Sequence, residues 1–130
     1  MLIIYNCDKM VDMKAIIIID HGSRYPAAND ALFDVVALMQ KKCPDCIVEA
    51  THMELADPTI EQAYKTCVKK GATHITAHPY MLSPGRHAIR DIPNMVSEIA
   101  SEYPDIPFDV TEPLGLDDHI IEVIKKRCNV

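Results

Sequence analysis

Two histidines of this chain lie just past apolar runs, each beside a glycine and an arginine. His21 occurs in IIIIDHGSR, and His87 occurs in HPYMLSPGRHAIRDIP. A neutral imidazole can bind a divalent transition metal or accept a proton near neutral pH, because its ordinary pKa is about 6.5. If the two rings meet in the fold, they form an open metal site, since two protein ligands are too few to enclose an ion.

The arginines of the chain gather in the same two segments. Of its four arginines, Arg24, Arg86 and Arg90 lie close to the two histidines. Guanidinium groups bind carboxylates through paired hydrogen bonds, so these segments are predicted to bind an anionic substrate. Ser23 adds a hydroxyl group, and Gly85 gives the second loop conformational freedom.

Glu54 is the third catalytic candidate. It follows the second predicted strand, in the segment MELADP. A carboxylate there can accept a proton or add a metal ligand. The alternative is that Glu54 caps the following segment, and the residue pattern leaves both functions open.

The elements that must position these residues alternate between strands and helices. A β-branched run such as Ile16–Ile19 is typical of a strand that is buried on both faces. The alternation predicts an α/β fold with an open, mainly parallel four-stranded sheet flanked by helices. The predicted strands cover 14–19, 46–53, 74–80 and 106–111, and the predicted helices cover 29–42, 58–70, 86–102 and 117–127.

In such a sheet, ligands bind outside the carboxyl ends of the strands. The loops that leave this edge contain His21, Glu54, His87 and the pair Leu114-Gly115. The first and third strands are commonly neighbours in doubly wound sheets, so we expect His21 and His87 to face each other across a cleft.

Three helix boundaries are also predicted. Asp57 is a candidate N-cap with Pro58 at the first helical position, and Gly71 should end that helix. Pro93 interrupts the third helix. The helix either kinks there or restarts with Asp91 as its cap and Pro93 in its first turn.

The composition is that of one ordinary globular domain. The chain has 130 residues, 48% of them hydrophobic and 25% charged, with a formal net charge of −6. We predict one domain over 14–130, after an N-terminal extension over 1–13. The acidic balance argues against nucleic-acid or anionic-membrane partners. With neither a signal peptide nor an apolar run of ~20 residues, a cytoplasmic location is expected.

The cysteines give a weak signal. There are five, and only Cys43 and Cys46 form a CxxC pair. One such pair without a second is a poor zinc motif, and its place between a helix and a strand does not fit a thioredoxin-like redox site. A structural or incidental role is therefore expected.

Taken together, these segments resemble the short form of the CbiX-type sirohydrochlorin chelatases, which belong to the class II chelatases. The matching pieces run in order along the chain: IIDHGSR with Asn29 downstream, MELADPTIEQA, HPYMLSPGRHAIRDIP and PLGLDDHI. The resemblance implies a chelatase half unit and a lyase of the cobaltochelatase type, acting on sirohydrochlorin in tetrapyrrole biosynthesis.

The resemblance also implies roles for individual residues. His21 and His87 would hold the metal ion and help to deprotonate the macrocycle. The arginines beside them, Arg24, Arg86 and Arg90, would bind its carboxylates. The metal would be a substrate, Co²⁺ first and otherwise Ni²⁺ or Fe²⁺, because all three accept imidazole. The half-size relatives work as homodimers, so a homodimer is expected here.

One departure and several alternatives remain. His52 and His78 occupy positions where the resemblance predicts apolar residues. No iron–sulfur cluster or tightly bound cofactor is expected. The alternatives are a metal or tetrapyrrole carrier without turnover, a phosphohistidine enzyme using His21, and a subunit whose sheet edge docks a partner. Phosphohistidine enzymes place Arg before the His-Gly pair, where this chain has Asp20.

Overall fold

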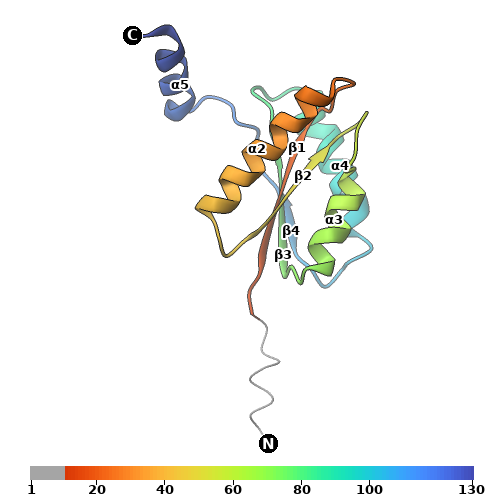
Figure 1. Cartoon of the computed structure of the whole chain (residues 1–130). Coiled ribbons are helices and arrows are strands. Elements are labelled where there is room, and N and C mark those ends of the chain that lie inside the picture. Colours follow the sequence, from red (N-terminus) through yellow and green to blue (C-terminus); the bar gives the residue numbers. More distant parts are fainter. Residues whose placement is uncertain (1–10) are drawn as a thin grey trace, which may run out of the picture.

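The computed structural model describes residues 11–130, so the expected N-terminal extension lies almost entirely outside the described part. The α/β fold class predicted from the sequence is confirmed (Figure 1). All three strand pairings are parallel, and the sheet order is β2-β1-β3-β4. The elements are β1 (Lys14–Asp20), α2 (Pro26–Lys42), β2 (Ile47–His52), α3 (Ile60–Lys69), β3 (His74–Pro79), a π-helical turn (His87–Asp91), α4 (Ile92–Ala100), β4 (Phe108–Val110) and α5 (Asp118–Cys128).

Strand β1 is the centre of the fold. It pairs with β2 on one side and with β3 on the other. Helices cover both faces of the sheet around it, and for this reason its sequence is a continuous β-branched run instead of an alternating one. The pairing of β1 with β3 confirms the prediction that the first and third strands are neighbours.

Two apolar clusters hold α2, α3 and α4 on the sheet. On one face, α3 and α4 pack against β1 and β3, with Tyr64, Ile92 and Val96 fully buried. On the other face, α2 packs through Leu32 against Ile18 of β1 and residues of β2. Figure 1 shows the same arrangement, with α2 on one side of the strands and α3 and α4 on the other.

The start of α3 differs from the prediction. Its N-cap is Thr59, and Asp57 lies outside the helix. The Thr59 hydroxyl accepts a hydrogen bond from Gln62 N, and the Gln62 side chain accepts one from Thr59 N. This reciprocal capping box satisfies two backbone N–H groups, which explains why it sets the boundary. The predicted stop is confirmed, because Gly71 follows the last residues of α3 with a φ of +93°.

Pro93 lies in the first turn of a restarted helix, as one of the two predictions required. Before it, the chain makes a π-helical turn in which Ile92 N donates to His87 O. Proline has no N–H, so an ordinary α-helical ladder cannot continue through this position. Asp91 occupies the N-cap position of this helix, as that prediction requires, but its side chain makes no capping hydrogen bond.

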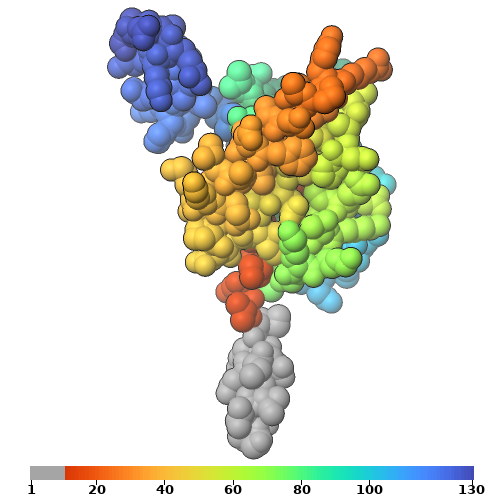
Figure 2. Space-filling view, in the orientation of Figure 1, coloured from red at the N-terminus to blue at the C-terminus, as the bar shows by residue number. Residues whose placement is uncertain are grey.

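Helix α5 has no buried residue and stands away from the sheet (Figures 1 and 2). Its N-cap is Asp117, whose carboxylate accepts from His119 N. Large apolar side chains of this helix are exposed, among them Ile121 and Ile124. No helix in residues 11–130 is both long and apolar enough to cross a bilayer.

The buried thiol of Cys67 predicts a pH dependence of stability. Burial raises the pKa of this thiol to about 12, whereas an unfolded cysteine titrates near ~8.5. Above pH ~9 the unfolded chain loses a proton that the folded chain keeps, so the free energy of unfolding falls by up to about 1.4 kcal/mol per pH unit. Urea denaturation at pH 8 and pH 10 should show a larger loss for the wild type than for Cys67→Ala. Equal losses in the two proteins would contradict this assignment.

Candidate functional site

The two histidines singled out from the sequence meet at the carboxyl edge of the sheet. Strands β1 and β3 are paired up to Ile19 and Pro79, so the chain leaves both at one place. His21 follows β1 directly, and the segment after β3 returns His87 to the same point. Their ring centroids are 4.9 Å apart, and the rings are nearly perpendicular, at 87°. The two side chains thus share one pocket.

The π-helical turn fixes His87. Asp91 lies one turn further on, and its Oδ2 is 3.1 Å from Nδ1 of His87. The other carboxylate oxygen of Asp91 accepts from Nε of Arg90 at 3.3 Å. A carboxylate beside Nδ1 favours the proton on that nitrogen, which leaves the Nε2 lone pair for a metal ion or a proton. The His87 side chain is 46% exposed.

His87 separates two adjoining cavities. Glu54, His87, Asp91 and Asn94 line a cavity of about 390 Å³, together with two methionines. On the other side, His21, Gly85 and His87 line a cavity of about 260 Å³. The structure therefore brings the three predicted catalytic residues to one region, with His87 common to both spaces.

Backbone hydrogen bonds carry the pairing of β1 and β2 past the ends of these strands. Met53 N donates to Asp20 O at 2.8 Å, and Glu54 N donates to His21 O at 3.1 Å. His21 and Glu54 are thereby held side by side through their main chains. Glu54 is exposed and lies in a loop, not in a helical cap.

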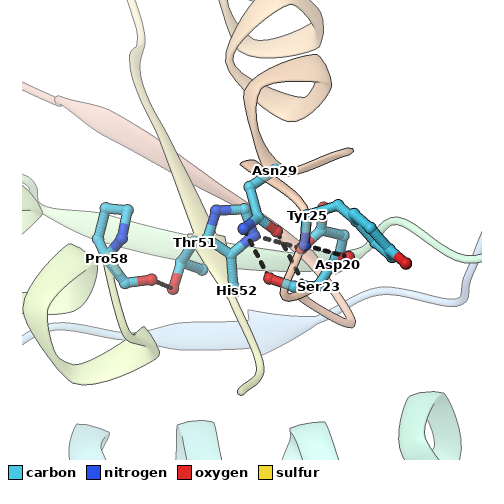
Figure 3. A network of polar contacts seen from close by, with 7 residues as sticks. All are labelled: Asp20, Ser23, Tyr25, Asn29, Thr51, His52 and Pro58. Atoms are coloured by element: carbon cyan, nitrogen blue, oxygen red, sulfur yellow. Dashed lines mark hydrogen bonds and ion pairs between the residues drawn. The ribbon is translucent and has the colours of Figure 1, made fainter. Parts of the chain in front are cut away.

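The loop that follows His21 is held by side-chain contacts (Figure 3). Asn29 of α2 accepts from Ser23 N at 2.9 Å and donates to Ser23 O at 2.8 Å. The Ser23 hydroxyl accepts from Tyr25 N at 3.0 Å. In this structure the Ser23 hydroxyl therefore orders the chain before α2, while its predicted contact with substrate stays a prediction.

The predicted substrate-binding arginines are close in sequence to the two histidines. Arg24 and Arg86 are exposed, and each is close in sequence to one of the two rings. Arg90 is also exposed, and it contacts Asp91. Among residues 11–130, neither Arg24 nor Arg86 forms an ion pair, so both guanidinium groups are available to an anion.

The fourth loop of this edge, which contains Leu114 and Gly115, supports the segment before His87. Leu114 N donates to Met81 O, and Gly115 N donates to Leu82 O, both at 2.9 Å. The loop thus holds one wall of the cavity that His21 lines, although none of its own side chains lines that cavity.

Three of the other four histidines make contacts within the sheet, and the fourth, His119, contacts Asp117 at the start of α5. Nδ1 of His78 lies 2.8 Å from the Thr111 hydroxyl, and burial lowers the pKa of this ring. Nε2 of His74 lies 2.8 Å from an Asp109 oxygen at the opposite edge of the sheet. His52 is fully buried and contacts Asp20. None of these three rings forms an aromatic contact with His21 or His87.

The CxxC pair lies away from the site. Cys43 ends α2 and Cys46 precedes β2, so both lie at the amino-terminal edge of the sheet. Their sulfur atoms are 3.4 Å apart without a disulfide. The pair is therefore no part of the histidine site.

Asp91 is the main site residue that was not predicted from the sequence as a functional residue. Its spacing of four residues from His87 is a detectable signal, because side chains at this spacing meet on one face of a helix. Asn94 and two methionines, Met53 and Met95, also line the larger cavity. Their residue types alone carry no such signal.

The donor set is open. Residues 11–130 contain no group of three or more His, Cys, Asp or Glu side chains arranged to hold a metal ion. An ion between His21 and His87 would keep most of its coordination positions for water or another ligand. This arrangement suits an ion that must be released.

The sequence matches a known protein family over most of its length. The CbiX family model matches residues 15–129. The chain belongs to the CbiX family. It is 40% identical over 116 residues to the chloroplastic sirohydrochlorin ferrochelatase of Arabidopsis thaliana, covering 89% of this chain and 52% of that protein. It is also 31% identical to the sirohydrochlorin cobaltochelatase of Methanocaldococcus jannaschii, covering 89% of this chain and 98% of that relative.

Solved structures give the same relationship. SirB from Bacillus subtilis with Fe³⁺ matches with a TM-score of 0.83 at 32% identity, covering 88% of this chain and 46% of that chain. SirB of subspecies spizizenii in complex with cobalt matches with a TM-score of 0.78. The CbiX chain thus spans about half the length of the ferrochelatase relatives that it matches.

Gly22 is predicted to be irreplaceable in the His21 loop. Its φ is +89°, and an added Cβ would overlap the Glu54 carbonyl oxygen and come within 3.1 Å of His52 Cβ. Gly71 is the matched control, because its φ is +93° but no atom lies within 4 Å of an added Cβ. Gly71→Ala should cost only backbone strain of about 1–2 kcal/mol. Gly22→Ala should cost at least ~1 kcal/mol more by urea denaturation, because it adds a steric clash. Equal costs would show that the His21 loop is not tightly packed.

Proposed function

We propose that this CbiX protein is a sirohydrochlorin metal chelatase, which inserts a divalent metal ion into sirohydrochlorin and releases two protons. The observation that supports this most directly is the edge-on pair of His21 and His87, whose centroids are 4.9 Å apart at the sheet edge. The chain matches about half of one relative and nearly all of another, and both relatives are named as sirohydrochlorin chelatases.

In this proposal His21 and His87 hold the metal ion before insertion. Neutral imidazole is a good ligand for Co²⁺, Ni²⁺ and Fe²⁺. Asp91 beside Nδ1 of His87 orients that ring and leaves its Nε2 lone pair free. With only two protein ligands, the ion exchanges them readily for the pyrrole nitrogens of the substrate.

The same residues take up the protons that the metal displaces. Each insertion removes two N–H protons from the macrocycle, so bases must lie near its centre. When the ion leaves the imidazoles, their lone pairs become available to accept protons. Glu54 lines the same cavity as His87 and supplies a carboxylate for passing a proton to solvent.

The arginines bind the periphery of the substrate. Sirohydrochlorin carries carboxylates around its ring, and exposed guanidinium groups bind such groups in pairs of hydrogen bonds. Arg24, Arg86 and Arg90 are exposed and close in sequence to the two histidines, in a protein whose net charge is −6. A local concentration of positive charge in an acidic protein favours binding of the anionic macrocycle at this edge.

The identity of the metal substrate and the location of the protein in the cell are proposed in more general terms than the reaction. Relatives include both ferrochelatases and cobaltochelatases, so Fe²⁺ stands beside the first choice, Co²⁺, and Ni²⁺ remains an alternative. The cytoplasmic location stays a prediction, because one relative is named as chloroplastic.

We further propose that the active form is a homodimer. The cavities beside His87, of about 390 and 260 Å³, are small for a tetrapyrrole with its side chains, so a second copy is needed to enclose the substrate. Helix α5 stands away from the sheet (Figure 2). We propose that it supplies the contact, because its apolar side chains are exposed, Ile121 at 41% and Ile124 at 51%. Such a face is stabilised when a second copy covers it.

The first prediction from this function concerns His87→Ala. The variant should fold normally, since the ring is half exposed, and it should lose metal insertion, because one of the two metal ligands and proton acceptors is missing. The measurement is the anaerobic absorbance change of sirohydrochlorin with Co²⁺, Fe²⁺ or Ni²⁺. His74→Ala, at the opposite sheet edge, is the control and should insert metal normally. Full activity of His87→Ala would refute the mechanism, and binding without turnover by the wild type would favour a carrier.

The second prediction concerns α5. Replacing Ile121 and Ile124 together by Glu should shift the protein from dimer to monomer, because burying two carboxylates in an apolar contact is unfavourable. Sedimentation velocity over a range of protein concentrations measures the change, and circular dichroism checks that the helix remains. A wild type that stays monomeric at all concentrations would exclude the proposed dimer.

A further inference from the structure

A fully buried histidine, His52, pairs with the partly buried Asp20 beside the loop that contains Ser23 (Figure 3). Asp20 and His52 are the last paired residues of β1 and β2. Nδ1 of His52 lies 2.6 Å from Oδ1 of Asp20. A carboxylate can only accept a hydrogen bond, so Nδ1 of His52 carries the proton and donates it. The residue that follows Asp20, directly after β1, is His21 itself.

Packing alone does not explain a histidine at position 52. The ring is completely buried, and Phe33 lies against it with ring centroids 6.1 Å apart. Among the described residues, Nε2 of His52 has no hydrogen-bond partner. Burying an unpaired ring nitrogen is unfavourable, and an apolar ring would fill the same space without that penalty. Within residues 11–130, the ring makes a single polar contact, the hydrogen bond to Asp20, and this contact indicates why a histidine is present.

The pair is connected to both site loops through the main chain. Asp20 O accepts from Met53 N, and His21 O accepts from Glu54 N, so the residues after Asp20 and after His52 run side by side into the site. Gly22 packs closely over this point, since an added Cβ would come within 3.1 Å of His52 Cβ. A change in the direction of Asp20 would therefore move the His21 ring relative to the His87 ring.

We infer that His52 is a positioning residue of the metal site. Its Nδ1–H holds the Asp20 carboxylate and thereby fixes the direction in which the chain leaves β1 toward His21. This inference rests on the proposed function, in which His21 and His87 hold the metal ion. His52 touches neither the ion nor the macrocycle, and it acts through the main chain of Asp20 and His21.

His52→Phe tests the inference, because phenylalanine keeps a ring of similar size and removes only the donor. Co²⁺ affinity, measured from the visible absorbance of the ion, should weaken roughly 10–100-fold, as is typical when a group that orients a metal ligand is lost. The value of kcat should fall more than the KM for sirohydrochlorin rises. The melting temperature should not fall, since the unpaired nitrogen is gone. A purely structural role would instead lower the melting temperature and leave the affinity unchanged.

Two further variants make the test specific. His52→Asn places an amide N–H on the same Cγ atom that bears Nδ1, so it should restore Co²⁺ affinity in large part. His74→Phe breaks a similar histidine–aspartate contact at the other edge of the sheet, and its Co²⁺ affinity should stay within about twofold of the wild type. A loss of affinity in His74→Phe as large as in His52→Phe would overturn the inference.

The Asp20 side of the pair gives an independent check. The Asp20 side chain is 21% exposed, so Asp20→Ala remains usable if His52→Phe does not fold. The same loss of Co²⁺ affinity is expected, and the double variant should be no worse than either single one. Wild-type affinity and kcat in folded His52→Phe or Asp20→Ala would overturn the inference, as would losses that multiply in the double variant.

His21→Ala separates failure of this inference from failure of the proposed function. If His21→Ala binds Co²⁺ as tightly as the wild type, the two-histidine site itself is wrong, whatever position 52 does. If His21→Ala loses the ion while His52→Phe and Asp20→Ala keep it, the metal site stands and only the positioning role of His52 fails.

Discussion

The parallel pairing of β1 with β3 is the constraint on which the rest of the site depends. His21 and His87 are distant in the sequence, and neither has a local partner that would bring it to the other. Because the two strands run in the same direction and are paired up to Ile19 and Pro79, their following loops leave at a common edge. The apolar contacts that hold α3 and α4 on the sheet are thus also what keeps the two imidazoles in one pocket.

A second level of order comes from the pairing of β1 with β2. Its hydrogen bonds continue beyond the strands, because Met53 N donates to Asp20 O and Glu54 N donates to His21 O. Asn29 then fixes the following turn through both atoms of its amide group. The loop that contains His21 is consequently a rigid extension of the sheet. Rigid placement suits the metal transfer proposed above, because an ion can pass between ligand sets only if both are held at suitable distances.

Much of this arrangement could be predicted from the sequence, and the reasons are physical. The run Ile16–Ile19 indicates a doubly covered strand, and the alternation of elements fixes a parallel sheet, so residues that follow strands must share an edge. Asp57 and Thr59 both fit the pattern of an N-cap, and only the reciprocal contact with Gln62 decides between them. The contact between Asp20 and His52 depends on strand register, which residue types do not specify.

The π-helical turn at His87–Asp91 has one more consequence, for how the family can vary. A backbone hydrogen bond from Ile92 N to His87 O closes this turn, and Ile92 is fully buried in the core. The main chain of His87 is therefore tied directly to a core residue, although its side chain lies at the sheet edge. A substitution that displaces the main chain of Ile92 would also displace the imidazole, so this part of the core and the histidine pair are expected to vary together among family members.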